Sequence, residues 1–337
     1  MKIAFYEIKE NDVNYFTERL KEHQLFFFKE PLKENNLVDA EIITLFVGSK
    51  ITKNILEKFG NLKYICTRST GYDHIDLREC KKRSILVSNV PGYSTEAIAE
   101  QTIALMLIVS RRLFESFERT RKGIFSSDGL TGFQLRGKTL GIIGTGRIGK
   151  RVAELAKAFG MKVIAYDIFP DFEKAKTIGY EYVDLEFLLS ESNIITLHAN
   201  LTEKNYHMLD KKAFEKMKDN VVIINTARGE LIDTEALIQH LNSGKVSAAA
   251  IDVLENEQEI RYGTKILERE IKENALRSAL SNFVLFEMED RLNGVVISPH
   301  NAFNTYEAIE ENKKITLENI LAFINGNPMN VVENENN

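Results

Sequence analysis

Short apolar runs alternate with amphipathic segments along the first 93 residues of the chain. Each run is bounded by polar residues, as a strand between helices would be. The runs that predict strands are Lys2–Tyr6, Leu25–Phe28, Ile42–Val47, Tyr64–Thr67 and Leu86–Ser88. Strands that alternate with helical segments are typical of an α/β layer built on a parallel sheet.

The pattern changes at Thr95. From there to about Phe117 the chain has no strand-like run, and the basic Arg111 comes late, which favours one long helix. The longest unbroken apolar run, Ile103–Val109, lies inside it and is far shorter than the roughly 18 residues of a membrane span. It predicts the buried face of a helix that links two units, followed by a polar loop over residues 122–138.

After this loop the alternation resumes with six candidate strands. Most are continuous and β-branched, as expected for strands covered on both faces. They are Thr139–Ile143, Val163–Tyr166, Ile194–Leu197, Val221–Asn225, Ala248–Asp252 and Val295–Ser298. Six parallel strands with intervening helices match the dinucleotide-binding arrangement. The helix-prone stretch Glu255–Gly294 predicts an insertion, and a final helix is expected over Thr305–Phe323, ending before Gly326.

Composition narrows the class of protein. A length of 337 residues suits two domains, and 44% apolar with 28% charged residues is typical of folded globular chains. The formal charge of -5 leaves no basic excess for nucleic acid. Cys66 and Cys80 form no Cys-x-x-Cys motif, so neither a disulfide framework nor a metal site is expected. With no secretory core or membrane span, the expected address is the cytoplasm.

A glycine motif follows the first strand of the second half. Gly144, Gly146 and Gly149 have the Gly-x-Gly-x-x-Gly spacing, and the helical pattern Arg147–Ala158 comes directly after the turn. Such glycines allow a tight turn, the approach of a pyrophosphate and close packing of helix on strand. Asp167 ends the next strand, where a carboxylate can bind both ribose hydroxyls and would repel a 2′-phosphate. The motif predicts NAD rather than NADP; a structural turn without a ligand is the alternative.

Three polar segments follow the fourth, fifth and sixth of these strands. They are Asn225–Gly229, Asp252–Glu257 and Ser298–Asn301. Because ligands bind at the carboxyl ends of parallel strands, we expect one guanidinium, one or two carboxylates and one imidazole to converge there.

This set of groups suits hydride transfer at a 2-oxo acid. Arg228 can hold the substrate carboxylate and polarise the carbonyl. His300 can give a proton to the carbonyl oxygen and remove it in the reverse reaction, and a neighbouring carboxylate would orient the imidazole and favour its charged form. A structural histidine and a local ion pair are the alternatives for these two residues. The histidines without such neighbours, expected to be surface or structural, are His23, His74, His207 and His240.

Together the motifs resemble those of the D-isomer-specific 2-hydroxyacid dehydrogenase family, and within it the bacterial D-lactate dehydrogenases. The resemblance covers residues 65–109 and 139–305. Besides the glycine motif it rests on Thr67–Asp76, Asn89–Ser94, Asn225–Gly229 and Ser298–His300. It implies a flavodoxin-like substrate domain over 1–98, completed by 300–337, a Rossmann-type NAD-binding domain over 99–299, and a cleft between them. It also implies a homodimer in which the linking helix packs against a second subunit.

The resemblance assigns roles to individual residues as well. The family's catalytic arginine, glutamate and histidine fall on Arg228, Glu257 and His300, with Glu255 as the alternative glutamate if the loop has another register. The NAD site is expected to comprise Gly144, Gly146, Arg147, Ile148, Gly149, Asp167, His198, Thr226, Ala227 and Asp252. Of these, Asp252 would contact the nicotinamide carboxamide.

The substrate site is expected in the first domain and just after the catalytic histidine. The backbone amides of Thr70 and Gly71 would receive the substrate carboxylate, and aromatic side chains would wall a small pocket. These side chains are Phe46, Tyr93 and Phe303.

The reaction implied is reduction of a small 2-oxo acid by NADH to the D-2-hydroxy acid, with pyruvate to D-lactate favoured. Reductases of hydroxypyruvate or of branched or aromatic 2-oxo acids share every motif above and stay open as alternatives. Outside enzymes, the alternative is a non-catalytic NAD(H)-sensing protein, because a corepressor branch shares the fold and the glycine motif.

Overall fold

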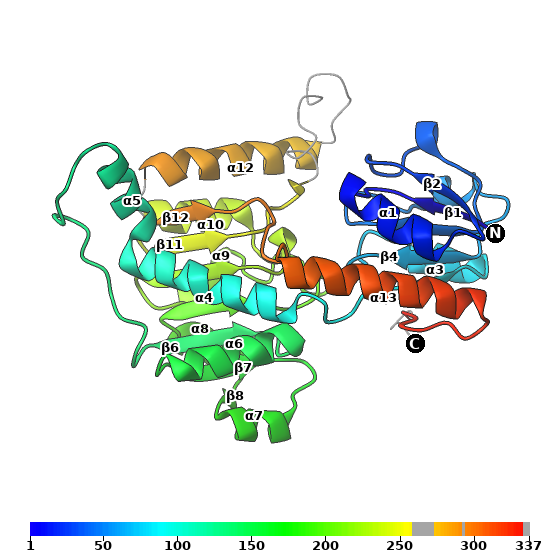
Figure 1. Cartoon of the computed structure of the whole chain (residues 1–337). Helices are drawn as coiled ribbons and strands as arrows, with labels where there is room; N and C mark the ends of the chain where they lie inside the picture. Colours follow the sequence, from blue (N-terminus) through cyan, green and yellow to red (C-terminus); the bar gives the residue numbers. More distant parts are fainter. Residues whose placement is uncertain (258–272, 292–293, 333–337) are drawn as a thin grey trace. The chain divides into compact units, whose positions relative to one another are not determined.

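The computed structural model describes residues 1–257, 273–291 and 294–332. The chain divides into two compact units, one formed by Met1–Ser94 with the chain from Asn304 on, and one formed by Thr95–Phe303. Each unit is built on a parallel sheet with helices on both faces (Figure 1). The predicted α/β fold class is therefore confirmed.

The first unit carries five parallel strands in the order β2-β1-β3-β4-β5, which is the flavodoxin-like order. The strands are β1 (Lys2–Phe5), β2 (Gln24–Phe27), β3 (Ile42–Leu45), β4 (Tyr64–Thr67) and β5 (Leu86–Ser88). All five lie where the apolar runs predict them. The helices are α1 (Glu10–Arg19), α2 (Lys53–Leu56), α3 (Leu77–Lys82) and α13 (Tyr306–Ile324), with a 3₁₀ turn η1 at Glu34–Asn36.

Alternate strand residues supply the two cores of this unit. Ile3 and Phe5 of β1 pack with Ile320 of α13 on one face of the sheet, and apolar residues of α2 and α3 cover the other face. The ring of Phe323 stacks on that of Tyr64, with 4.3 Å between centroids and 4° between planes. The last helix is anchored in this way to the sheet formed by the start of the chain.

The second unit carries seven parallel strands in the order β12-β11-β10-β9-β6-β7-β8. They are β6 (Thr139–Ile143), β7 (Lys162–Tyr166), β8 (Glu181–Tyr182), β9 (Ile194–Leu197), β10 (Val221–Asn225), β11 (Val246–Ile251) and β12 (Val295–Ile297). Six of them were predicted, and β8 was missed because its two residues form no apolar run. From β11 to β8 the order is that of a dinucleotide-binding sheet.

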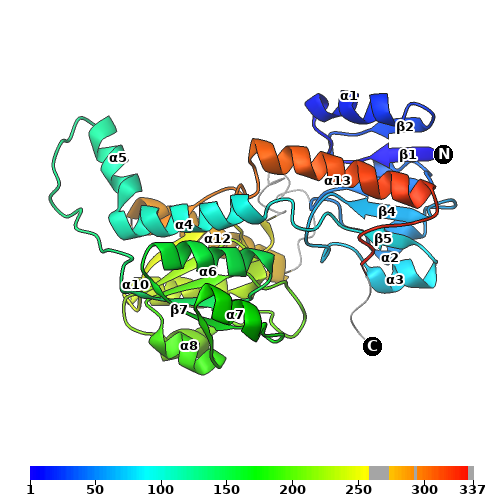
Figure 2. The same ribbon diagram turned by 60° about the horizontal axis from the view of Figure 1, so that its bottom comes forward.

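Helices cover both faces of this sheet (Figure 2). One face is covered by α4 (Thr95–Arg111), α6 (Arg147–Ala158) and α7 (Phe172–Ile178). The other is covered by α8 (Leu185–Glu191), α9 (Lys211–Lys216), α10 (Thr234–Asn242) and α12 (Glu273–Arg291), and a 3₁₀ turn η2 spans Gly229–Leu231. Helix α12 lies in the predicted insertion; residues 258–272 and 292–293 of that stretch are outside the described residues.

The expectation of a single helix from Thr95 to Phe117 is wrong. The segment breaks at Arg112, which has φ +50°, and continues as α5 (Leu113–Arg121). The carbonyl oxygen of Ser110 accepts a hydrogen bond from the amide of Phe133 (2.8 Å), and a Cβ on Gly132 would lie 2.1 Å from that oxygen. The loop that follows α5 thus takes an acceptor that a continuous helix would use itself.

In the described part of the chain, each helix is too short or too polar to cross a membrane.

Candidate active site

The glycine motif folds as a turn between β6 and α6. Gly144 has φ +92°, and a Cβ there would lie 2.6 Å from the amide nitrogen of Ala199. A Cβ on Gly149 would lie 2.0 Å from the Gly144 carbonyl oxygen, so a side chain would push α6 off the turn. A Cβ on Gly146, by contrast, would meet no atom within 4 Å. The fold requires the first and third glycines, whereas the second leaves the backbone open to a ligand, as pyrophosphate binding needs.

Asp167 follows β7 and is half-buried beside this turn. Its Oδ2 accepts hydrogen bonds from the amide (2.6 Å) and the hydroxyl (2.9 Å) of Thr145, and its Oδ1 accepts one from the amide of Phe169 (2.8 Å). The next side chains, Ile168 and Phe169, are apolar and mostly exposed. The carboxylate is thus held at the strand end with no cation following it, which fits a ribose without a 2′-phosphate.

His198 and Thr226 lie at the ends of β9 and β10; β9 pairs with β6, and β10 pairs with β9. Burial lowers the pKa of His198 to about 3, so its imidazole is uncharged at neutral pH. Its amide donates to the carbonyl oxygen of Ile143 (2.7 Å). The hydroxyl of Thr226 lies 3.0 Å from that of Thr102 on α4. Uncharged, fixed groups therefore follow the glycine motif along the sheet.

Arg228 lies in the turn after β10. The buried Asn225 side chain closes this turn, accepting from the amide of Ala227 (3.0 Å) and donating to the Arg228 carbonyl oxygen (2.8 Å). The half-buried guanidinium donates to the Ala227 carbonyl oxygen (2.8 Å). A Cβ on Gly229 would lie 2.1 Å from the carbonyl carbon of Leu254. The arginine turn is therefore packed backbone to backbone against the loop that follows β11.

Glu257 and His300 come together from the loops after β11 and β12. Oε1 of Glu257 lies 2.6 Å from Nδ1 of His300, and the two side chains are 24% and 18% exposed. His300 has φ +50°, an uncommon conformation for histidine, and its amide donates to the carbonyl oxygens of Asp252 (2.8 Å) and Ser298 (2.9 Å). The ring of Phe303 stands edge-on to the imidazole, with 6.1 Å between centroids. Because the carboxylate occupies Nδ1, proton exchange with a substrate falls to Nε2.

The carboxylate of Asp252 holds the histidine turn. It is almost fully buried, and it accepts from the hydroxyl of Ser298 (2.5 Å) and from the amides of Asn301 and Ala302 (2.9 Å each). These contacts stabilise the positive φ of His300, which is an unfavourable backbone conformation for histidine. The expected contact of Asp252 with a nicotinamide carboxamide stays a prediction.

The predicted carboxylate site of the first unit lies on the loop after β4. Within residues 1–257, 273–291 and 294–332, no acceptor binds the backbone amides of Thr70 and Gly71. The Thr70 hydroxyl donates to the carbonyl oxygen of Val90 (3.1 Å), and Asn89 donates to that of Thr70 (2.8 Å). Tyr93 is half-buried on the same β5 loop. The two amides are fixed in place and available to an anion.

Two charged residues that the sequence analysis missed hold the loop after β3, which carries Phe46. Glu7 has φ +56°, and its carboxylate accepts from the amides of Phe46 (3.0 Å) and Gly48 (2.8 Å). The buried guanidinium of Arg68 donates to the carbonyl oxygens of Tyr6 (2.6 Å) and Glu7 (2.7 Å). Their only signal in the sequence is a charge directly after a strand.

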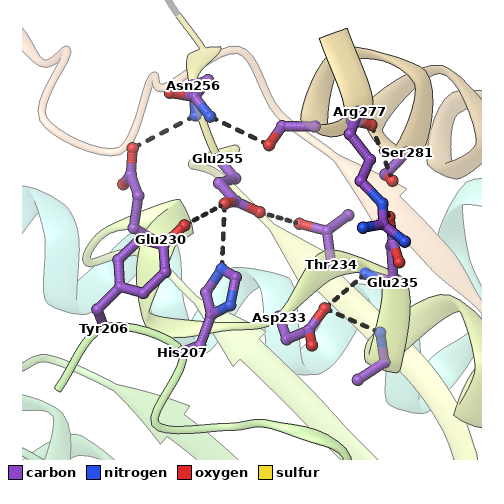
Figure 3. Close-up of polar contacts among 12 residues, drawn as sticks. Tyr206, His207, Glu230, Asp233, Thr234, Glu235, Glu255, Asn256, Arg277 and Ser281 are labelled. Carbon is purple, nitrogen blue, oxygen red and sulfur yellow. Dashed lines mark hydrogen bonds and ion pairs between the residues drawn. The ribbon is translucent and has the colours of Figure 1, made fainter. Parts of the chain in front are cut away.

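Glu255 is not the partner of His300. It is buried, and its carboxylate accepts from the Tyr206 hydroxyl (2.9 Å), His207 Nε2 (3.0 Å) and the Thr234 hydroxyl (3.2 Å) (Figure 3). The expectation that His207 lacks a carboxylate neighbour is wrong. The pairing joins residues 48 positions apart, so spacing along the chain gives no sign of it.

Among the residues that the structure places, no three His, Cys, Asp or Glu side chains are grouped to hold a metal ion.

Comparison with known proteins agrees with this arrangement. Residues 103–302 match the family model described as D-isomer specific 2-hydroxyacid dehydrogenase, NAD binding domain. The D-lactate dehydrogenase of Escherichia coli K12 is 37% identical over 331 residues, covering 95% of this chain and 96% of that protein. An aromatic 2-oxoacid reductase of Clostridium sporogenes is 42% identical over 284 residues, covering 83% and 82%.

A solved structure is similar over nearly the whole chain. The crystal structure of D-lactate dehydrogenase from Aquifex aeolicus, complexed with NAD and lactic acid, has a TM-score of 0.88 and 39% identity and covers 96% of each chain. The chain belongs to the D-isomer-specific 2-hydroxyacid dehydrogenase family and is an NAD-dependent oxidoreductase.

Proposed function

We propose that the chain reduces a small 2-oxo acid reversibly to the D-2-hydroxy acid, with pyruvate to D-lactate as the preferred case. The observation that carries this proposal is the 2.6 Å contact between Glu257 Oε1 and His300 Nδ1, on loops that neighbour the Arg228 turn. A carboxylate, an imidazole and a guanidinium are the groups that proton delivery to a polarised carbonyl requires.

Substrate binding is assigned to groups of both units. The amides of Thr70 and Gly71 receive the substrate carboxylate, and the forked donors of Arg228 bind carboxylate and carbonyl oxygens. Phe46, Tyr93 and Phe303 wall the pocket. A small, anionic 2-oxo acid matches this combination of donors and aromatic side chains.

The cofactor site is assigned to the glycine turn and the strand ends beside it. Gly146 and the first residues of α6, Arg147 and Ile148, receive the pyrophosphate, and Asp167 binds the adenosine ribose. Ala227 joins the uncharged groups of His198 and Thr226 toward the nicotinamide.

Proton transfer is assigned to the Glu257–His300 pair. Bound NADH supplies a hydride to the carbonyl carbon. His300, in its charged form, gives the proton on Nε2 to the carbonyl oxygen, and the neutral imidazole removes it from the hydroxyl in the reverse direction. Glu257 meets Nδ1 and so holds the imidazole in the orientation that leaves Nε2 to the substrate. Reduction therefore consumes one proton from water for each 2-hydroxy acid formed.

The test is oxidation of NADH by the purified protein, followed by absorbance. Pyruvate, hydroxypyruvate, 2-oxoisocaproate and phenylpyruvate are supplied separately, with NADPH as the matched cofactor control. We expect the highest kcat/KM with pyruvate and NADH, and D-lactate as the product. Formation of L-lactate, or no turnover of any of the four acids, would refute the proposal.

A second candidate has one observation in its favour. The Clostridium sporogenes aromatic 2-oxoacid reductase is 42% identical to this chain, against 37% for the E. coli D-lactate dehydrogenase, although over a shorter stretch. A kcat/KM for phenylpyruvate above that for pyruvate would favour this candidate and leave the assigned roles of Arg228, Glu257 and His300 unchanged.

We also propose that the chain forms a homodimer. Large apolar side chains of α5 and the loop after it are exposed, namely Phe114, Phe117, Ile124 and Phe125. Exposed apolar groups of this size are typical of an interaction surface. Light scattering should give twice the chain mass of 38.5 kDa. Phe117→Asp should shift the population toward the mass of one chain. A monomeric wild-type protein would contradict the proposal.

A further inference from the structure

The turn after β11, which carries Glu257, is held mainly by side chains. Asn256 has φ +51°, in the left-handed region that asparagine tolerates. Its amide donates to the carboxylate of Glu230 (3.3 Å), and its side chain donates to the hydroxyl of Ser278 on α12 (3.1 Å) (Figure 3). The position of Glu257 therefore depends on how firmly the residues just before it are fixed.

Glu255 of this turn accepts four hydrogen bonds. Oε1 accepts from Tyr206 and His207, Oε2 accepts from Thr234, and the backbone carbonyl oxygen accepts from the side chain of Asn282 on α12 (2.7 Å). Three donors that converge on one group call for an acceptor without protons, which is an ionised carboxylate. An amide of the same shape would turn an N–H group toward at least one of these donors.

The donors are themselves fixed. His207 has φ +52°, its amide donates to the Glu230 carbonyl oxygen (2.8 Å), and its ring stacks on that of Tyr206 with 4.0 Å between centroids. Burial and the Glu255 carboxylate raise the pKa of Tyr206 to about 12, so its hydroxyl keeps its proton at neutral pH. The other carboxylates near this tyrosine are Glu230 and Asp233, and Asp233 caps α10 by accepting from the amides of residues 235 and 236.

We propose that Glu255 is a positioning residue: it ties the turn after β11 to the Tyr206–His207 loop and to the start of α10, and so fixes the Glu257 carboxylate at Nδ1 of His300. The inference rests on the proposed function, because it concerns the acid–base pair assigned there. It gives the two glutamates of one turn separate tasks. Loosening Glu255 should let Glu257 move away from the imidazole and weaken its 2.6 Å contact with Nδ1.

The experiment uses histidine-labelled protein and heteronuclear NMR, which needs no substrate. The chain has six histidines, and His300→Gln identifies the signal of His300. We expect Glu255→Gln to move the Nδ1 resonance of His300, measured at one fixed pH, away from its wild-type position, because its hydrogen bond with Glu257 is weakened. It should also reduce kcat with pyruvate about 3- to 10-fold without changing the KM for NADH, since the glycine turn is untouched.

Glu235→Gln is the matched control. Glu235 lies beside Thr234, but its side chain is 41% exposed and pairs with Arg277 at 2.5 Å (Figure 3). Glu235→Gln should leave both the Nδ1 resonance of His300 and kcat at wild-type values.

A second pair of variants decides the matter if Glu255→Gln does not fold. His207→Gln keeps an N–H donor for Glu255 and His207→Leu removes it, so only the leucine variant should move the Nδ1 resonance of His300. A lowered melting temperature with a wild-type Nδ1 resonance and wild-type kcat, in Glu255→Gln or in His207→Leu, would overturn the proposal and leave Glu255 a purely structural role. Failure of the wild-type protein to reduce any 2-oxo acid would refute the proposed function alone, because the NMR result stands without it.

Discussion

The glutamates of two glutamate–histidine pairs lie on one short turn of this protein, and their surroundings differ. Glu257 meets His300 at 2.6 Å with both side chains partly exposed, whereas Glu255, with a side chain only 6% exposed, meets His207 at 3.0 Å. The first pair lies on the loops after β11 and β12. The second is surrounded by the hydroxyls of Tyr206 and Thr234.

The comparison shows that residue type and distance do not identify an acid–base pair. Both contacts satisfy the criterion for a hydrogen-bonded imidazole and carboxylate. The difference lies in the carboxylates: Glu255 is 6% exposed and also accepts from the hydroxyls of Tyr206 and Thr234, whereas Glu257 is 24% exposed. The exposure of the carboxylate and its further donors therefore distinguish the pair proposed to be catalytic from the pair buried in the fold.

The strongest test of this contrast is removal of each histidine. His300→Ala should reduce kcat about 1,000-fold, as loss of a general acid does, while NADH affinity stays unchanged. His207→Ala should keep kcat within about tenfold but lower the free energy of unfolding by about 1–3 kcal/mol, because buried Glu255 loses a donor. Steady-state kinetics and urea unfolding measure both effects. Equal losses of kcat in the two variants would remove the distinction.

Replacement of Arg228 should have the next largest effect. Arg228→Lys keeps the charge but loses the fork of donors, so kcat/KM for pyruvate should fall roughly 10- to 100-fold. Arg277→Lys is the control, since Arg277 pairs with Glu235 and is 72% exposed. Wild-type kcat/KM in Arg228→Lys would argue that the guanidinium does not bind substrate.

A variant of the proposed ribose site tests whether NADH binding is independent of the Glu257–His300 pair. Asp167→Ala should raise the KM for NADH about tenfold and reduce the preference for NADH over NADPH, because the ribose loses its acceptor. Asp219→Ala, at an 82% exposed side chain paired with Lys245, should change neither value. An unchanged cofactor preference in Asp167→Ala would contradict the assignment of the ribose site.

A third histidine, His198, whose ring lies 3.0 Å from the hydroxyl of Thr196, should make stability depend on acid pH. The pKa of His198 is lowered to about 3 by burial. Below about pH 6.5 the unfolded chain therefore binds a proton at His198 that the folded chain does not bind. Its contribution is present at neutral pH and is lost as the pH falls below about 6.5, by at most about 1.4 kcal/mol per pH unit. Urea unfolding at pH 7, 6 and 5 should show a flatter acid decline for His198→Gln. An identical decline would show that this histidine is not buried uncharged.

The sequence predicts regular elements well where a run of apolar residues marks them. It fails at β8, where Glu181 and Tyr182 pair with β7 through their backbone alone, without an apolar run. It fails again at Arg112, because the helix there is broken by contacts from residues 132 and 133, which follow a loop. Both failures come from partners that are distant in the sequence.

The sequence likewise predicts the candidate site residues but not the contacts that support them. Motifs placed Arg228, Glu257 and His300 at neighbouring strand ends, because parallel strands bring those ends to one edge. The supports of these residues were not predictable: Glu255 and His207 are 48 positions apart. The Glu7 carboxylate likewise binds the amide of Phe46, a residue on the loop after a neighbouring strand. Such pairings depend on packing in three dimensions and leave no motif in the sequence.

The central claim is that the Glu257 carboxylate orients His300 for proton transfer, and kcat for pyruvate in Glu257→Gln tests it most directly. Glutamine keeps the shape of the side chain and removes the charge that meets Nδ1 of His300. We expect kcat to fall about 10- to 100-fold and the melting temperature to stay within about 2 °C of wild type. Wild-type kcat in this variant would contradict the account.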